Sequence, residues 1–182
     1  MVPFLLVGVV LALVFTLNAV SGQRVDEILR YQRDGGSWRL MSYVLVHQDF
    51  AHLILNLFGL LAIFAMFMEH FARFRLLVFI PLAALAGGLG MALLSPDVYI
   101  TYGFSSVLYG LFIAGAILEI GSGEAGRRAL GVFMAVAVVI KVGFDLYSLP
   151  AGLAVSAHAG GASFGLLWAT YVIIRQRQMV AQ

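Results

Sequence analysis

The sequence predicts an all-α protein that sits in a lipid bilayer as a bundle of six membrane-spanning helices. Of its 182 residues, 62% are hydrophobic and only 11% are charged, whereas soluble domains average about 45–50% apolar and about 25% charged residues. A small soluble globule cannot hide so many apolar side chains from water. The chain also contains six apolar runs, each close to the roughly 17–25 residues that a spanning helix needs. The lipid bilayer is therefore the first predicted partner.

The six predicted spans follow one another without a long linker, an internal repeat or a low-complexity segment. In chain order they cover residues 3–20, 51–69, 74–94, 105–120, 129–148 and 156–174. The turns after the second and fourth spans are only a few residues long. We therefore expect residues 1–182 to form one compact membrane domain.

The first span has no basic segment before it, so we expect an anchor helix in place of a secretory signal. The segment 21–50 that follows places Val25 and Ile28 at helical spacing. It also contains Trp38 and Arg39, which suit the headgroup zone of a bilayer. This pattern predicts a loop that lies on the membrane surface and has no catalytic role.

Basic residues predict the orientation of the bundle. Arginines follow the second, fourth and sixth spans, whereas the loops 95–104 and 149–155 contain no Lys or Arg. The positive-inside rule then places both termini in the cytoplasm. The segment 21–50 is an exception, because it holds four arginines and is predicted to lie outside.

The composition also excludes several classes of function. The net charge is only +2 and the basic residues are scattered, which argues against nucleic acid as a partner. The chain has no cysteine, so disulfides and thiol chemistry are excluded. His47 and His52 are five residues apart and no HExxH motif accompanies them, so no metal site is predicted. We interpret His47 as a surface histidine at headgroup level.

Polar residues inside three spans share one depth. The second, fourth and sixth spans run in the same direction, and His52, Asn56, Ser105 and His158 lie within their first two turns. Polar groups at such positions are costly in lipid and point to function. His52 and Asn56 are four residues apart and share one helical face. All four residues are therefore candidates for a single site.

Rows of small residues predict which spans approach each other closely. The row in the fourth span contains Ser106, Gly110 and Ala114, and the row in the sixth contains Ala157, Gly161, Gly165 and Ala169. Such rows permit near backbone contact between helices. Ser105 and His158 adjoin these rows, so facing rows would bring a hydroxyl beside an imidazole. A serine needs an adjacent base to act as a nucleophile, and histidine titrates near neutral pH.

This juxtaposition predicts a Ser–His dyad, because no carboxylate accompanies His158 within its span. The backbone N–H of Ser105, the positive end of its helix and the side chains of Asn56 and His52 would stabilise an oxyanion. By itself, Ser105 would more often be a helix N-cap. The fourth span has sixteen residues, and at about 1.5 Å per residue it falls short of a core about 30 Å thick. We expect the loop 95–104 to dip into the bundle, where water can enter.

These motifs resemble those of the rhomboid family of intramembrane serine proteases. The resemblance rests on residues 103–106 (GFSS) at the start of a helix, on the HxxxN pair His52 and Asn56, and on residues 158–161 (HAGG). It covers nearly the whole chain and implies a six-helix rhomboid-like bundle. It also implies a serine endopeptidase that cleaves single-pass transmembrane proteins near the outer membrane face and uses no cofactor.

When the family's functional roles are assigned to the matching residues of this chain, the resemblance implies that Ser105 is the nucleophile and His158 the general base and acid. It assigns His52 and Asn56 to the oxyanion hole, and Tyr109 to a ring packed beside the catalytic histidine.

One position departs from the family pattern, because Ser106 stands where a glycine usually follows the nucleophile. Ser105 remains the preferred nucleophile, because Gly103 keeps the family register and Tyr109 lies one turn below. Gly103 and Gly161 are predicted as supporting residues. The departure keeps open an alternative, a proteolytically inactive rhomboid-like binder of membrane helices.

Within the family, the chain is most similar to the rhombosortase branch. This similarity rests on its short length, on the stretch 102–119, on Lys141 with Asp145 and on residues 154–158. It implies a bacterial inner-membrane enzyme whose substrates carry a C-terminal signal made of Gly-Gly, an apolar helix and a basic tail.

Lys141 and Asp145 are four residues apart near the outer end of the fifth span. A self-neutralising pair is the favoured interpretation, because pairing limits the cost of burying charge. The functional alternative is that the pair shapes a substrate gate or binds a polar group of the substrate. A small transporter with a proton relay is a third hypothesis for the chain, although the sequence lacks paired broken helices and inverted repeats.

Overall fold

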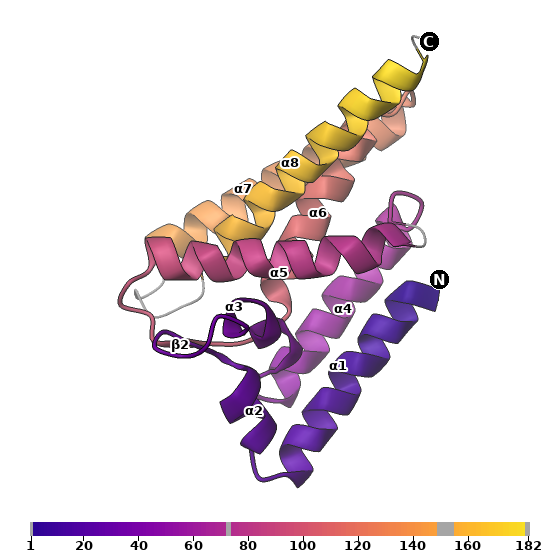
Figure 1. Ribbon diagram of the computed structural model, residues 1–182. Coiled ribbons are helices and arrows are strands. Elements are labelled where there is room, and N and C mark those ends of the chain that lie inside the picture. The colour runs from indigo at the N-terminus through magenta and orange to yellow at the C-terminus, as the bar shows by residue number, and fades with distance from the viewer. Residues whose placement is uncertain (1, 72–73, 149–154, 181–182) are drawn as a thin grey trace.

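The computed structural model describes residues 2–71, 74–148 and 155–180, and it is dominated by helices. Its six long helices are α1 (Val2–Val20), α4 (Phe50–Phe67), α5 (Phe74–Leu94), α6 (Ser105–Ile120), α7 (Ala125–Ser148) and α8 (Val155–Val180). They agree with the six predicted spans to within a few residues, except that α8 continues beyond residue 174 (Figure 1). The prediction of an all-α fold is confirmed.

Four of these helices are long and apolar enough to cross a bilayer. They are α1, α4, residues Arg75–Leu94 of α5 and residues Val155–Met179 of α8. The helix α6 is also apolar but has only 16 residues. The fold is therefore that of a membrane protein, and the number of six spans stays a prediction.

The segment between α1 and α4 is more ordered than a plain surface loop. It contains α2 (Arg24–Leu29), β1 (Tyr31–Gln32), α3 (Arg39–Ser42) and the 3₁₀ turn η1 (Tyr43–Leu45). The strand β1 pairs antiparallel with β2 (Ile100–Thr101), with Tyr31 opposite Thr101. This pairing ties the first loop to the segment that leads into α6.

The helix α6 lies at the centre of the bundle, and most of its residues are buried. It packs against α8, α7 and α4, while α5 packs mainly on α8 and α1 packs on α4. In Figure 1, α1 and α4 lie side by side, and α6, α7 and α8 form a second group. The residue that opens α6 is therefore surrounded by several other elements.

Small residues allow α6 and α8 to touch through their backbones. A Cβ atom added to Gly161 would overlap the carbonyl oxygen of Ser106, and one added to Gly165 would overlap that of Gly110. A similar overlap would occur between Gly160 of α8 and the Ala86 carbonyl of α5. The predicted approach of the two small-residue rows is confirmed.

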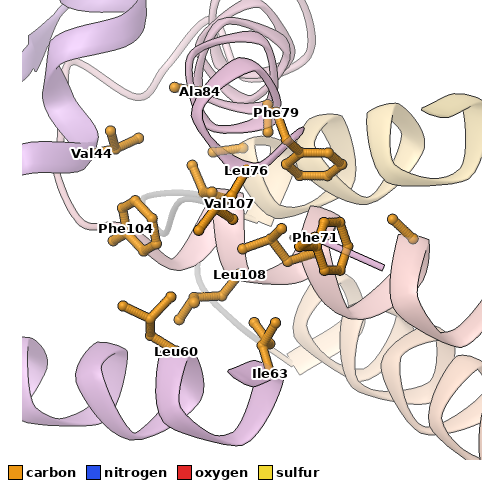
Figure 2. Close-up of a cluster of buried hydrophobic side chains, with 14 of the residues drawn as sticks. Val44, Leu60, Ile63, Phe71, Leu76, Phe79, Ala84, Phe104, Val107 and Leu108 are labelled. Atoms are coloured by element: carbon orange, nitrogen blue, oxygen red, sulfur yellow. The ribbon is translucent and has the colours of Figure 1, made fainter. Parts of the chain in front are cut away.

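A cluster of buried apolar side chains fills the space beneath the start of α6. Figure 2 shows side chains of η1, α4, α5 and α6, such as Val44, Leu60, Leu76 and Val107, that converge in this cluster with Phe104, the residue before α6. Phe104 is 1% exposed and Val107 fully buried. This packing fixes the first turn of α6, which carries Ser105.

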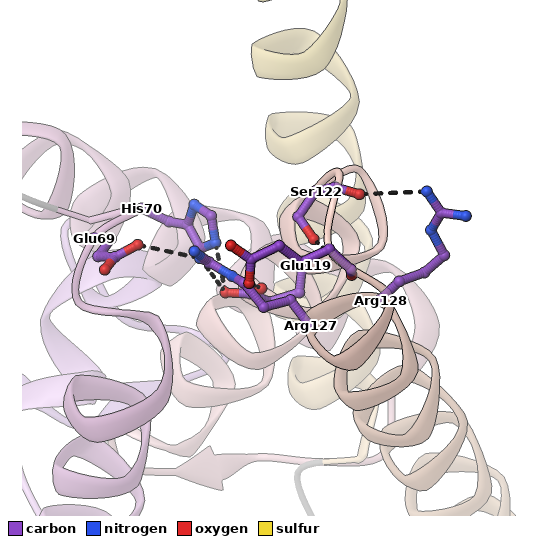
Figure 3. Close-up of polar contacts among 7 residues, drawn as sticks. Glu69, His70, Glu119, Ser122, Arg127 and Arg128 are labelled. Atoms are coloured by element: carbon purple, nitrogen blue, oxygen red, sulfur yellow. Dashed lines mark hydrogen bonds and ion pairs between the residues drawn. The ribbon is translucent and has the colours of Figure 1, made fainter.

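Polar groups join three elements at the opposite end of α6 (Figure 3). The side chain of Glu119 is only 3% exposed and accepts two bonds from Arg127, at 2.6 and 2.9 Å. His70 Nε2 lies 2.9 Å from the same carboxylate, and Arg127 also reaches Glu69 at 3.1 Å. A buried carboxylate is tolerated when charged and polar donors satisfy it. This cluster connects the segment after α4 and the first turn of α7 to α6.

Candidate active site

The serine that opens α6 and the histidine in the first turn of α8 are in direct contact. Ser105 Oγ lies 2.8 Å from His158 Nε2. Phe104, not Ser105, occupies the N-cap position, and it makes no side-chain capping bond. Ser105 is thus the first residue of the helix, and the alternative in which it serves only as an N-cap does not describe its place. A hydroxyl hydrogen-bonded to an imidazole has the arrangement of a nucleophile with its base.

An aromatic ring holds the imidazole in place. The ring of Tyr109 stacks on that of His158, with centroids 4.4 Å apart and an interplanar angle of 19°. Tyr109 is four residues after Ser105 and so lies on the same face of α6. The predicted packing of Tyr109 beside the histidine is confirmed, and it restricts the plane in which Nε2 can point.

Gly103 adopts a backbone conformation that few other residues tolerate. Its φ is +113°, and its N–H donates to the carbonyl of Tyr43 at 3.0 Å. A Cβ atom at this position would lie 2.6 Å from both Cε1 and Nε2 of His52. Only glycine meets both demands. The result is that the His52 imidazole lies against the backbone two residues before Ser105.

The HxxxN pair lies at the start of α4. Asp49 caps this helix by accepting from the backbone N–H of His52 at 2.7 Å. Asn56 is 3% exposed, and its Nδ2 donates to the carbonyl of His52 at 2.8 Å. An amide nitrogen carries two hydrogens, so a second donor remains for another acceptor. The assignment of His52 and Asn56 to an oxyanion hole stays a prediction.

Ser106 has different partners from those of its neighbour. It is 1% exposed, and its Oγ lies 2.7 Å from the hydroxyl of Tyr43. The Tyr43 hydroxyl in turn donates to the carbonyl of Ala84 at 3.3 Å, and burial raises its pKa. The second hydroxyl thus belongs to a buried hydrogen-bonded pair, which gives Ser106 a structural role.

His47 is buried in the structure, whereas the sequence analysis interpreted it as a surface histidine. It is not at the surface, because only 2% of it is exposed. Its ring lies edge-on to that of His52, with centroids 5.2 Å apart. Within the described part of the chain, neither ring nitrogen has a hydrogen-bond partner. The signal that pointed to burial was the apolar run Val44–Val46 directly before it.

Burial next to His52 lowers the pKa of His47 to about 4. His47 is therefore neutral in the folded protein at pH 5, whereas in the unfolded chain, at its ordinary pKa of 6.5, it binds a proton. Stability should fall as the pH decreases from 6.5 to 4, by about 2 kcal/mol between pH 7 and pH 5. Thermal unfolding in detergent micelles measures this loss. A His47→Phe variant should lose less stability over the same interval, and an identical loss would contradict the assignment.

An apolar cavity of about 280 Å³ opens beside Ser105, between α6 and α7. On the α6 side it is lined by residues that include Ser105 and Tyr109. On the α7 side it is lined by one helical face, Met134, Ala137, Val138 and Lys141. The hydroxyl of the Ser–His pair is thus reached through a groove large enough for apolar side chains.

The described residues contain no group of three or more His, Cys, Asp or Glu side chains suited to a metal ion. The polar side chains that the structure brings to this site are the Ser105 hydroxyl, the imidazoles of His158 and His52, and the Asn56 amide. Asp145 belongs to α7, but its side chain lies outside the described part of the structure.

Fold and site together define a helical membrane protein with a Ser–His pair where two packed helices begin. The family model for the Rhomboid domain matches residues 34–175, a range that includes every residue of this site. The chain belongs to the rhomboid family, whose members are typically serine intramembrane proteases. A search of curated proteins finds no match to this chain.

Proposed function

We propose that this protein is an intramembrane serine endopeptidase that uses Ser105 and His158 as a catalytic dyad. The observation that carries the proposal is the 2.8 Å contact between Ser105 Oγ and His158 Nε2. No other hydroxyl is needed for this role, because Ser106 is engaged by Tyr43.

In the proposed reaction, His158 accepts the proton of Ser105 while Oγ attacks a substrate carbonyl. Negative charge then develops on the carbonyl oxygen. The backbone N–H of Ser105, the second Nδ2 hydrogen of Asn56 and the His52 imidazole stabilise this charge, which is usually a large part of the catalytic effect. His158 donates its proton to the leaving amine, and water then hydrolyses the acyl-enzyme with His158 as the base. No cofactor takes part.

The proposed substrates are single-pass transmembrane proteins whose cut site enters the groove between α6 and α7. A substrate helix must unwind to present a carbonyl, so we expect small or helix-breaking residues at the cut site. A narrower proposal is that the enzyme processes C-terminal Gly-Gly sorting signals as rhombosortases do. We place it in the bacterial inner membrane, with both termini cytoplasmic and the cut near the outer face.

A serine-reactive fluorophosphonate probe and a cleavage assay test this proposal together. The purified protein should be labelled at Ser105 and should cut tagged single-pass proteins, with the cut site read by intact mass. A Gly-Gly signal and a version with both glycines replaced by leucine test the narrower proposal. A folded protein that is neither labelled nor active would favour the inactive helix binder instead.

A further inference from the structure

Among the described residues that line the groove beside Ser105, one is charged. The other lining residues are apolar or uncharged, whereas Lys141 carries a positive charge. The lining residues of α7 are spaced as one continuous helical face, with Lys141 as its last member. Lys141 is therefore part of the surface that a bound substrate segment would contact.

The packing of α6 against α7 places Lys141 near the depth of Ser105. At the far end of the pair, Gly131 fits against the backbone of Ala116 and Ile120. From Gly131, ten residues along α7 lead to Lys141. From its neighbour Ala116, eleven residues along α6 lead back to Ser105. At about 1.5 Å per residue these paths have nearly the same length. Lys141 and Ser105 thus face one cavity at matching height.

We propose that Lys141 is a specificity-determining residue that selects substrates by charge. Substrates with Asp or Glu within three residues of the cut bond are preferred, and substrates with Lys or Arg there are rejected. This inference rests on the proposed protease function and names the substrate chemistry that the groove takes.

The physical reason is the apolar character of the groove. Charges interact more strongly where water is excluded, so a substrate cation is repelled and a carboxylate is attracted. An ammonium group has three N–H donors. The contact that Lys141 already makes within the protein is therefore compatible with a substrate carboxylate.

The test uses a synthetic single-pass peptide in detergent micelles, with an Ala-Gly cut region and Asp, Asn or Lys at each of three positions on either side. The native protein should cleave the best Asp peptide at least about tenfold faster than its Lys counterpart, with Asn between them. Lys141→Arg should keep this order, Lys141→Met should remove it, and Lys141→Glu should reverse it. Arg128→Glu makes the same charge change in the exposed first turn of α7 and should leave the order unchanged.

Binding of the same peptides to Ser105→Ala protein, measured by fluorescence anisotropy, separates this inference from the proposed function. Charge-selective binding without any cleavage by the native protein would support the role of Lys141 and overturn the protease. The role of Lys141 would be overturned if the native protein, Lys141→Met and Lys141→Glu all cleaved the peptides in the same order. It would also be overturned if binding to the Ser105→Ala protein did not depend on peptide charge.

Discussion

Replacing Ser105 with alanine will lower kcat/KM for substrate cleavage by at least about a thousandfold and leave the bundle folded. The change removes the hydroxyl that contacts His158 Nε2. Without a nucleophile, only binding and oxyanion stabilisation remain, and such residual catalysis is small. The stacking of Tyr109 on His158 does not involve Oγ, so the site should keep its shape. Single-turnover cleavage of a tagged substrate measures the rate, and thermal unfolding checks the fold.

Ser106→Ala is the matched control, because it deletes a hydroxyl from the adjacent residue. It should retain cleavage and fluorophosphonate labelling. It should also lose about 1–2 kcal/mol of stability, because the buried Tyr43 hydroxyl loses a partner at 2.7 Å. Turnover that survives in Ser105→Ala but disappears in Ser106→Ala would move the nucleophile by one residue.

The six long helices were predictable because a bilayer forces every backbone polar group of a span to be satisfied within it. The resulting apolar runs appear directly in the sequence. The meeting of Ser105 and His158 was predictable for a related reason. Parallel helices of known start depth, each with a row of small residues, have few ways to pack.

The polar contacts around this frame were not predictable from such patterns. The pairing of β1 with β2 depends on irregular turns, for which the sequence carries no periodicity. The contact of Ser106 with Tyr43 joins residues 63 positions apart. The cluster around Glu119 joins three separate elements. Contacts of this kind follow from the completed fold and not from local spacing.

Replacing Gly161 with leucine should abolish cleavage and lower the unfolding free energy by at least about 3 kcal/mol. For a chain of this size that loss corresponds to a decrease in Tm of about 6–12 °C. The physical reason is that even a Cβ atom at Gly161 would overlap the Ser106 carbonyl. Because that contact is with backbone and not with a flexible side chain, α8 must move away from α6. Thermal unfolding in micelles and the cleavage assay measure the two effects.

Gly143→Leu is the control for this change, because Gly143 lies in α7 and, outside its own helix backbone and chain neighbours, no described atom comes within 4 Å of an added Cβ. Equal stability of Gly143→Leu and Gly161→Leu would contradict the close backbone contact of α6 with α8.

The smaller change Gly161→Ala separates packing from catalysis. A single methyl group must still push α8 away from Ser106, and His158 is on the same helix, less than one turn earlier. The bundle can absorb such a shift at modest cost, whereas a displacement of about 1 Å between reacting groups can lower a rate about a hundredfold. Gly161→Ala should therefore lower the cleavage rate by up to about a hundredfold while it lowers the unfolding free energy only modestly. If the loss of cleavage, expressed as a free energy, only equals the loss of unfolding free energy, the helices do not move as rigid bodies. The Ser105–His158 contact is then not set by the approach of α6 to α8.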